Sequence, residues 1–257
     1  MFVNNLSPTI VKIGFLQIRW YGLVYALGFL ITYLYLKKHE QELGLKNKLE
    51  VFLLYLFFGL LIGARVGHLL YNVPYYSKHL TQVFAFWLGG MSFYGGLAGV
   101  VIVGLLFCKK HNLDFFLLAD KLSIIAALFL GFGRIANFLN SELVGLPTSK
   151  PWCVVFVNVD NLCRHPVQIY EALKNFFIFS TLLVIDGLKL KGKVKLVKGA
   201  LFALFLTMYG LLRFLTNFYR DEPLHYGLNT GQWLGIALFI IGIALWVKLH
   251  ARAKNNP

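Results

Sequence analysis

The sequence predicts an all-α polytopic membrane protein with about seven transmembrane helices and a small periplasmic head. Two observations carry this prediction. First, 58% of the 257 residues are hydrophobic and only 14% are charged, whereas soluble domains are about 45–50% apolar and about 25% charged. Second, the apolar residues form long runs separated by short polar connections, and a run of about 20 residues spans a bilayer as a helix. We therefore expect a single integral membrane domain over residues 1–257.

The apolar runs follow one another along the chain. Residues 1–16 lack the basic start, apolar stretch and cleavage site of a secretory signal peptide, so we expect the first run to be retained. The predicted spans are 18–36, 50–71, 91–108, 116–139, 166–187, 199–219 and 230–248.

The Lys and Arg residues between these runs predict the orientation. Cytoplasmic loops carry an excess of Lys and Arg. The larger set of connections holds Lys37, Lys38, Lys46, Lys48, Lys109, Lys110, Lys189, Lys191, Lys193, Lys195, Lys198, Lys248, Arg252 and Lys254, and the opposite set holds Lys12, Lys78, Lys150, Arg164 and Arg220. We therefore expect a bacterial inner (cytoplasmic) membrane protein with its N-terminus outside and its C-terminus in the cytoplasm. The net charge of +14 then reflects topology and an anionic lipid surface, with no nucleic-acid partner.

The longest outer connection, about residues 141–165, is expected to contribute to the periplasmic head. Its Val154–Val157 run indicates either a short strand or an interfacial segment. Long loops with structure of their own often carry function. Cys153 and Cys163 share this connection, so a disulfide is possible but not required. The cysteines have no metal-like spacing, and we expect neither a metal nor a cofactor.

Polar residues within the spans are not scattered at random. They fall at the start of odd spans and at the end of even spans, which places them all on the outer side. These residues are Arg19, Tyr21, Arg65, His68, Ser92, Tyr94, Arg134, Asn137, Asn140, His165, Gln168, Glu171, Arg213, Asn217, Arg220 and Gln232. Lys174 lies three residues after Glu171, and we interpret the two as a local helical pair.

Three of these residues, Arg65, Arg134 and Arg213, indicate an anion site. An Arg at mid-membrane costs about 2.5–3.5 kcal/mol on insertion scales. A single Arg often only extends its head group toward the interface, but three on one side favour a partly buried, outward-facing cationic cavity. The planar donor fork of Arg matches phosphate.

Six blocks of the sequence resemble the phosphatidylglycerol–prolipoprotein diacylglyceryl transferase family. Residues 133–145 read Gly-Arg-Ile-Ala-Asn-Phe-Leu-Asn-Ser-Glu-Leu-Val-Gly, which is similar to the family signature. The remaining blocks are Arg19–Leu23, Gly63–Gly67, Gly89–Gly96, Arg164–Glu171 and Tyr209–Gly210 with Arg213 and Arg220. The resemblance extends from about residue 19 to residue 232. It implies a seven-helix body with a periplasmic head.

The resemblance also implies an activity and its partners. Family members transfer the diacylglyceryl group of phosphatidylglycerol to the lipobox cysteine thiol of a prolipoprotein signal peptide, within the bilayer, and release glycerol 1-phosphate. Negative charge grows on the departing phosphate, so fixed cations lower the barrier. Expected catalytic residues are Arg134, Arg213, Tyr94 and Glu142, and expected substrate-binding residues are Tyr21, Arg65, Asn137, Asn140, Gly145, His165, Gln168, Glu171 and Arg220. Glu142 is expected either to hold an Arg or to help take the thiol proton.

Two positions depart from the family pattern. Tyr94 stands where members usually carry His, and Asn217 stands where they often carry an acid. The reference pKa is about 10 for Tyr and about 8.5 for a free thiol, so neutral Tyr94 is a poor base. A weakly active paralogue is therefore one alternative. Another is a transporter for an anionic solute, although a transporter should present polar groups at the midplane or to both sides. A third is a non-catalytic lipid-binding protein.

Topology supplies the first testable prediction. A periplasm-dependent phosphatase fused within Lys189–Lys198 should be inactive, and one fused near Lys150 should be active, because the positive-inside bias places only the first segment in the cytoplasm. Enzyme activity in cells expressing each fusion measures this. Activity from the Lys189–Lys198 fusion would reverse the orientation and move the polar helix ends to the cytoplasm.

Overall fold

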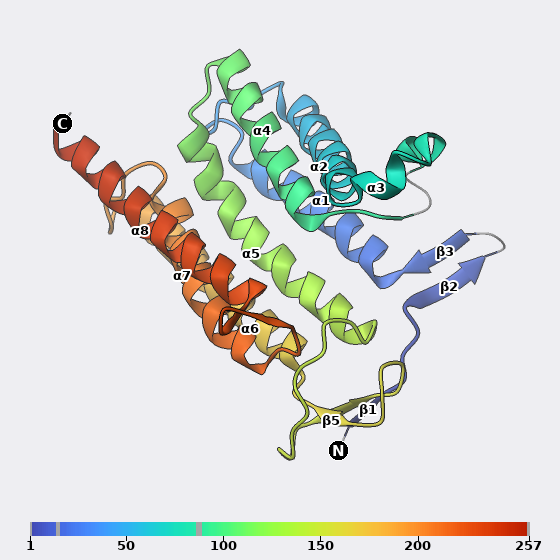
Figure 1. Cartoon of the computed structure of the whole chain (residues 1–257). Helices are drawn as coiled ribbons and strands as arrows, with labels where there is room; N and C mark the ends of the chain where they lie inside the picture. The colour runs from blue at the N-terminus through green and yellow to red at the C-terminus, as the bar shows by residue number, and fades with distance from the viewer. Residues whose placement is uncertain (1, 14–15, 86–88, 256–257) are drawn as a thin grey trace. The chain divides into compact units, whose positions relative to one another are not determined.

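The computed structural model describes residues 2–13, 16–85 and 89–255, and it has a helix in each of the seven predicted ranges (Figure 1). These helices are α1 (Trp20–Lys38), α2 (Leu49–Tyr71), α4 (Phe93–His111), α5 (Phe115–Leu139), α6 (Val167–Leu190), α7 (Ala200–Thr216) and α8 (Thr230–Asn255). Short helical turns follow α2 and α7, namely α3 (Val73–Tyr76), the 3-10 helix η1 (Leu80–Phe84) and the 3-10 helix η3 (Asn217–Tyr219).

Among the described residues, five helices are long and apolar enough to cross a membrane. They cover Leu49–Tyr71, Phe93–His111, Phe115–Leu139, Ala200–Tyr219 and Thr230–Lys254. The prediction of an all-α membrane protein is thereby confirmed. Helices α1 and α6 fall outside this group: α1 ends in Lys37 and Lys38, and α6 carries several ionisable side chains. The number of seven spans stays a prediction.

The chain divides into two compact units. Unit 1 comprises the residues up to Thr32 together with those from Ala119 onward, and unit 2 comprises Tyr33–Leu118. Helices α1 and α5 each contribute to both units. The prediction of a single domain concerns how these units work together, and it stays a prediction.

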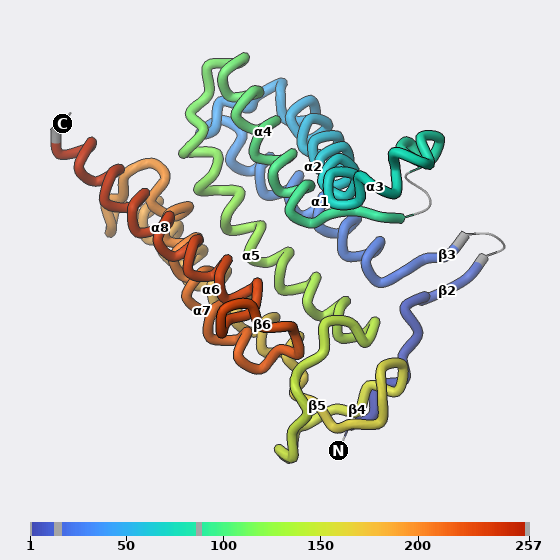
Figure 2. The backbone as a smooth tube through the Cα atoms, in the orientation of Figure 1, coloured from blue at the N-terminus to red at the C-terminus, as the bar shows by residue number. Residues whose placement is uncertain are grey.

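Close helix packing in unit 1 depends on small residues. Helix α7 runs along α8, and α6 packs against α7 (Figures 1 and 2). A Cβ atom on Gly210 of α7 would lie 2.5 Å from the Phe239 nitrogen and 2.6 Å from the Gly235 oxygen of α8. Only the absence of a side chain allows this approach, which is typical of membrane helices.

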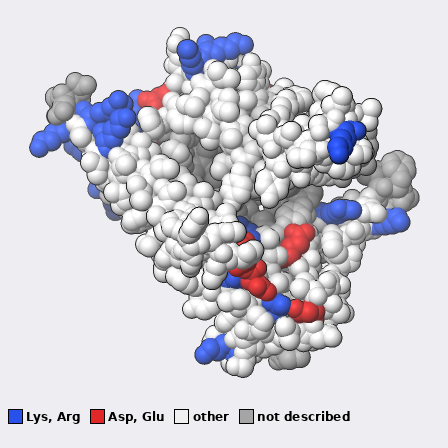
Figure 3. Space-filling model, in the orientation of Figure 1, with Lys and Arg blue, Asp and Glu red and all other residues white. Residues whose placement is uncertain are grey.

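One end of unit 1 is held by acidic side chains. Asp120 of α5 accepts hydrogen bonds from the backbone nitrogens of Gly199 and Phe202, at 2.9 and 2.8 Å, and so caps the start of α7. Lys121 donates to both carboxylate oxygens of Asp186 in α6, each at 2.9 Å, and this ion pair is buried. At the same end, Lys and Arg gather around the end of α8 (Figure 3).

The opposite end of unit 1 carries a small sheet and a disulfide. Strands β1 (Phe2–Asn4), β4 (Val154–Phe156) and β5 (Cys163–Arg164) form a sheet in the order β1-β4-β5, with β1 parallel to β4 and β4 antiparallel to β5. Residues Val154–Phe156 of the Val154–Val157 run therefore form a strand, one of the two alternatives left open by the sequence. Cys153 and Cys163 form a disulfide.

Chain segments near the N-terminus add structure that the sequence did not predict. Asn4 of β1 is fully buried and donates to the Phe138 carbonyl at 2.6 Å, which ties the first strand to the end of α5. Strands β2 (Thr9–Ile13) and β3 (Leu16–Arg19) pair antiparallel before α1. Nearer the C-terminus, β6 (Leu224–His225) and β7 (Leu228–Asn229) also pair antiparallel, before α8.

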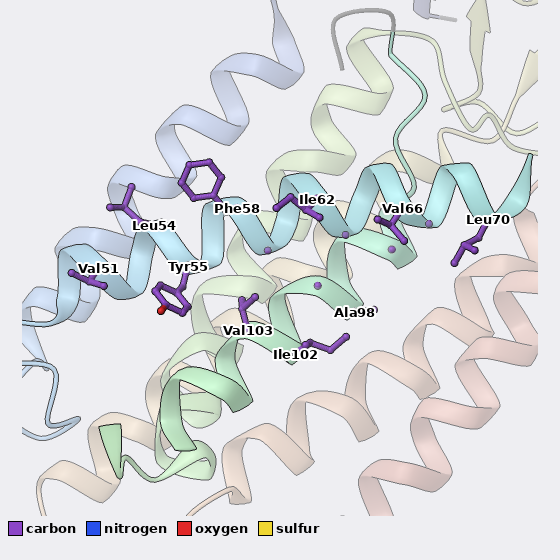
Figure 4. Close-up of a pocket in the computed structure, with 15 residues that line it drawn as sticks. Val51, Leu54, Tyr55, Phe58, Ile62, Val66, Leu70, Ala98, Ile102 and Val103 are labelled. Atoms are coloured by element: carbon purple, nitrogen blue, oxygen red, sulfur yellow. The ribbon is translucent and has the colours of Figure 1, made fainter. Parts of the chain in front are cut away.

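Unit 2 is built on the pairing of α2 with α4. Ser92 caps α4 by accepting from the Gly95 nitrogen at 3.2 Å, and its own nitrogen donates to the Ala64 carbonyl of α2 at 2.9 Å. Glycines bring the two helices together, since a Cβ on Gly67 would lie 2.7 Å from the Gly95 Cα. An apolar groove with a volume of about 660 Å³ runs along this pair. Figure 4 shows the residues that line it.

Candidate functional site

A buried ion-pair cluster lies at the strand end of unit 1. Glu171, in the first turns of α6, is 1% exposed. One of its carboxylate oxygens lies 2.5 Å from Nε of Arg134, which α5 supplies, and the other lies 3.4 Å from Nη1 of Arg220, which follows η3. Nε of Arg220 also lies 2.8 Å from Glu222. One carboxylate therefore joins arginines from two separate segments of the chain.

Two further cations surround this carboxylate. Arg213 of α7 donates to the Tyr209 hydroxyl at 3.0 Å, one helical turn away. The ammonium nitrogen of Lys174 lies 4.5 Å from the centre of the same Tyr209 ring. The charges of all four cations, Arg134, Lys174, Arg213 and Arg220, act on the Glu171 carboxylate. With Glu222 included, two carboxylates face four cations, and the excess positive charge favours an anion.

A hydrogen-bond network centred on Glu142 adjoins the cluster. The Tyr21 hydroxyl donates to one Glu142 oxygen at 2.7 Å, and the Asn137 amide donates to the same oxygen at 3.0 Å and contacts the Tyr21 hydroxyl. Asn140 donates to the other oxygen at 3.2 Å. Arg134 donates to the Asn137 oxygen at 3.2 Å and so links the network to the ion pairs.

From the sequence, Glu142 is expected either to hold an Arg or to help take the thiol proton. In the structure its carboxylate accepts from Tyr21, Asn137 and Asn140, and Gln168 of α6 donates to its backbone carbonyl at 2.7 Å. Its side chain thus organises neutral donors, while Glu171 holds the arginines.

Gly145 and His165 belong to the loop framework behind the cluster. A Cβ on Gly145 would lie 2.8 Å from the Tyr219 carbonyl and would also collide with the His165 carbonyl, so glycine permits the approach of three backbone segments. Nδ1 of His165 lies 3.1 Å from the Tyr170 hydroxyl. Partial burial, with the nearby charge of Lys150, lowers the pKa of His165 and favours the neutral imidazole.

A partly buried ion pair in this framework responds to pH. Nη2 of Arg164 lies 2.5 Å from Asp160, and Nη1 lies 2.7 Å from Asp221. The Arg164 guanidinium lowers the pKa of the Asp160 carboxyl below its ordinary value. The pairing therefore contributes stability above the ordinary Asp pKa, and this contribution is lost as the pH falls through the lowered value.

The other two predicted site residues, Arg65 and Tyr94, lie in unit 2. Arg65 is 3% exposed and donates to the carbonyls of Val83 at 3.0 Å, Gly89 at 2.7 Å and Gly90 at 3.2 Å, and to that of Gln82. It thus anchors the segment before α4. Tyr94, in the first turn of α4, is half exposed, and its ring packs edge to face on Phe93. All remaining predicted site residues lie in unit 1.

Lys174 and Tyr209 were not recognised from the sequence as site residues. The sequence suggested that Lys174 pairs with Glu171 along the helix, but both Glu171 oxygens contact arginines and the Lys174 ammonium lies over Tyr209. The available signal was a Lys within the predicted span 166–187, next to Asn175 and three residues after Glu171, because a charged residue there is costly in a membrane helix.

The fold and this cluster define a helical membrane protein with a buried cationic site suited to an anionic ligand. A family model described as prolipoprotein diacylglyceryl transferase matches residues 8–248. The chain is 35% identical, over an alignment of 263 positions, to the phosphatidylglycerol–prolipoprotein diacylglyceryl transferase of Geobacter sulfurreducens. The alignment covers 98% of both proteins. It is 37% identical to the proteins of the same name from Bordetella avium, covering 98% of both, and Tolumonas auensis, covering 99% of both.

The chain therefore belongs to the prolipoprotein diacylglyceryl transferase family. The resemblance stated from the sequence is confirmed, as is the class of enzyme that it implied, a membrane-bound transferase of lipoprotein biosynthesis.

The two carboxylates around Arg220 give a second testable prediction. Glu171→Gln should lower the free energy of unfolding by about 3–5 kcal/mol, because it leaves buried guanidinium groups without their counter-charge. Glu222→Gln, at a carboxylate that is 27% exposed, should cost less than about 1 kcal/mol. Thermal unfolding in detergent compares the two. Equal losses would show that Glu171 does not organise the cluster.

Proposed function

We propose that this enzyme binds the phosphate of phosphatidylglycerol at Arg134, Arg213 and Arg220 and transfers the diacylglyceryl group to the lipobox cysteine of prolipoproteins. The relatives carry both substrates in their names. The observation that carries the proposal is a net positive charge at the buried helix ends, where four cations face only two carboxylates. A monoanionic phosphodiester matches that excess, and the Arg forks suit its oxygens.

The reaction exchanges one bond for another. The cysteine sulfur attacks the terminal glycerol carbon of the diacylglyceryl group, and the bond between that carbon and the phosphate oxygen breaks. The oxygen keeps the electron pair and leaves as glycerol 1-phosphate, so the phosphate gains a second negative charge. The thiol proton passes to an acceptor. Fixed cations stabilise the growing charge without reorganising, and Arg134 and Arg213 are assigned this role.

Neighbouring residues position the substrate and the arginines. Glu171 orients Arg134 and Arg220 through its two oxygens. Tyr21, Asn137 and Asn140 form the polar network that adjoins Arg134 and supply donors for glycerol or phosphate oxygens. Because Glu142 is exposed, its carboxylate is the candidate acceptor for the thiol proton.

Other predicted residues are assigned framework roles. Gln168 fixes the Glu142 backbone, and Gly145 and His165 hold the loop segments behind the cluster. Arg65 is assigned to anchoring the segment before α4 in unit 2.

The proposed topology has seven spans, with α1 and α6 included, and the cluster on the outer side. Within unit 1, the polar starts of α6 and α8 and the polar ends of α5 and α7 lie at one end, and the Lys-rich segment between α6 and α7 lies at the other. The Cys153–Cys163 disulfide supports an oxidising compartment for the sheet, which we assign as the periplasmic head. The bacterial inner membrane fits this helix orientation and the disulfide. Unit 1 and unit 2 would then form one membrane domain.

The arginines give a third prediction, which also tests the function. Purified protein, labelled phosphatidylglycerol and a lipobox peptide should yield labelled peptide and glycerol 1-phosphate. Arg134→Lys and Arg213→Lys should each lower kcat at least about tenfold, since Lys keeps the charge but loses the bidentate fork. Arg252→Lys at the end of α8 is the matched control and should be unchanged.

Two results would contradict this assignment. A folded wild-type protein without transfer would remove the proposed function and favour the weakly active paralogue or the transporter. Near-normal turnover in Arg134→Lys or Arg213→Lys would show that diffuse positive charge is sufficient.

Tyr94 gives a fourth prediction. We propose that Tyr94 acts as a hydrogen-bond donor or packing group and is not the base. Tyr94→Phe should then reduce kcat about two- to tenfold, the value of one hydrogen bond, and Tyr94→His should retain or raise activity. The same transfer assay measures both, with Phe93→Leu as the control for ring loss at this helix start. A loss of a thousandfold or more in Tyr94→Phe would mean that the hydroxyl transfers a proton.

A further inference from the structure

Lys174 is a buried cation without a strong partner. Its side chain lies in α6 and is 6% exposed, and its ammonium has no hydrogen-bond partner among the described residues. An ammonium carries three donors, and a buried charge is costly unless it is paired. Lys121 shows how unit 1 treats another buried lysine, because that ammonium donates to both Asp186 oxygens at 2.9 Å. The Lys174 ammonium would therefore be stabilised by an anionic partner from outside the chain.

The surroundings of Lys174 place it beside the proposed phosphate site. Its nitrogen lies 4.5 Å from the Tyr209 ring centre, and Arg213 donates to the hydroxyl of that same ring. The charged and titratable groups that act on Lys174 are Glu171 on its own helix, Tyr209 and Arg213 on α7, and Arg134 on α5. Glu171 is the carboxylate of this set, and its oxygens contact Arg134 and Arg220. Lys174 thus has no carboxylate to itself.

We propose that Lys174 is a catalytic residue that donates to the departing phosphate as its second negative charge develops. This inference rests on the proposed function and adds a role to its site. The substrate diester carries one negative charge, and glycerol 1-phosphate carries nearly two above the second phosphate pKa of about 6. In the step written above, the carbon–oxygen bond breaks and its electron pair moves onto the phosphate oxygen. A cation used mainly at that stage raises kcat rather than substrate affinity.

The residue type fits this division of labour. The arginines present planar forks that match the two free oxygens of the diester. The Lys ammonium is a compact charge with rotatable donors on a flexible stem, so it can follow the oxygen that acquires the new charge. If Lys174 only made a structural cation–π contact with Tyr209, its removal would lower the stability of the protein. It would then affect the binding of phosphatidylglycerol and of glycerol 1-phosphate to a similar degree.

The test compares the substrate with the product. In full-length protein, we would measure kcat and KM for phosphatidylglycerol and the inhibition constant of glycerol 1-phosphate at pH 7.5. Lys174→Met should lower kcat and raise the inhibition constant, each about ten- to a hundredfold as for a charged hydrogen bond, and KM should change less than about threefold. Lys174→Arg should restore much of both. Lys189→Met, which removes a charge from the far end of the same helix, should resemble wild type.

Each outcome decides the proposal. An unchanged kcat and inhibition constant in Lys174→Met would overturn it. Equal rises in KM and the inhibition constant, together with a lower melting temperature, would also overturn it and assign Lys174 to packing. If Lys174→Met does not fold, the same constants are measured for Lys174→Gln, whose side chain is polar but uncharged. An inactive wild type would refute the proposed function itself. An active wild type, together with an unchanged kcat and inhibition constant in the variants, would refute only the role of Lys174.

Discussion

The Glu171 carboxylate is the constraint on which the candidate site depends. It is almost completely buried, and it holds guanidinium groups from α5 and from the segment after η3 at its two oxygens. Removing four charged side chains from water is costly unless each has a counter-charge. Two carboxylates, Glu171 and the partly exposed Glu222, face four cations and satisfy this only in part, so the cluster is held in place and still attracts an anion.

The loop framework keeps this cluster at the ends of the helices. Arg164 in β5 donates to the Gly145 carbonyl and pairs with Asp160 and Asp221, which joins the segments around Gly145, Arg164 and Asp221. Gly145 permits this because a side chain there would collide with neighbouring backbone. The disulfide and the β1-β4-β5 sheet stabilise the same region. Helices that end in such a framework present their polar residues to one another rather than to lipid.

Two kinds of polar group divide the site. The network of Tyr21, Asn137, Asn140 and Glu142 offers mostly neutral donors, and the Glu171 cluster offers positive charge. Arg134 touches both, through Asn137 and through Glu171. Neutral donors recognise hydroxyl and ester oxygens of a lipid head group, while cations respond to changes in phosphate charge. This division matches a substrate whose phosphate is bound as a monoanion and is released in the product as a dianion.

The sequence by itself determined the helices and the side of the bundle on which the polar residues of unit 1 meet. Long apolar runs can fold only as spanning helices in lipid, and the alternation of polar ends follows from helices that reverse direction. Tertiary structure decided the partners. The sequence suggested a Lys174–Glu171 pair, but α5 and the Arg220 segment bring arginines to both Glu171 oxygens. Strand β1 was not predictable because three residues carry no periodic signal, and its hydrogen bonds depend on β4, about 150 residues away. Contacts between distant segments are set by packing, which local sequence does not encode.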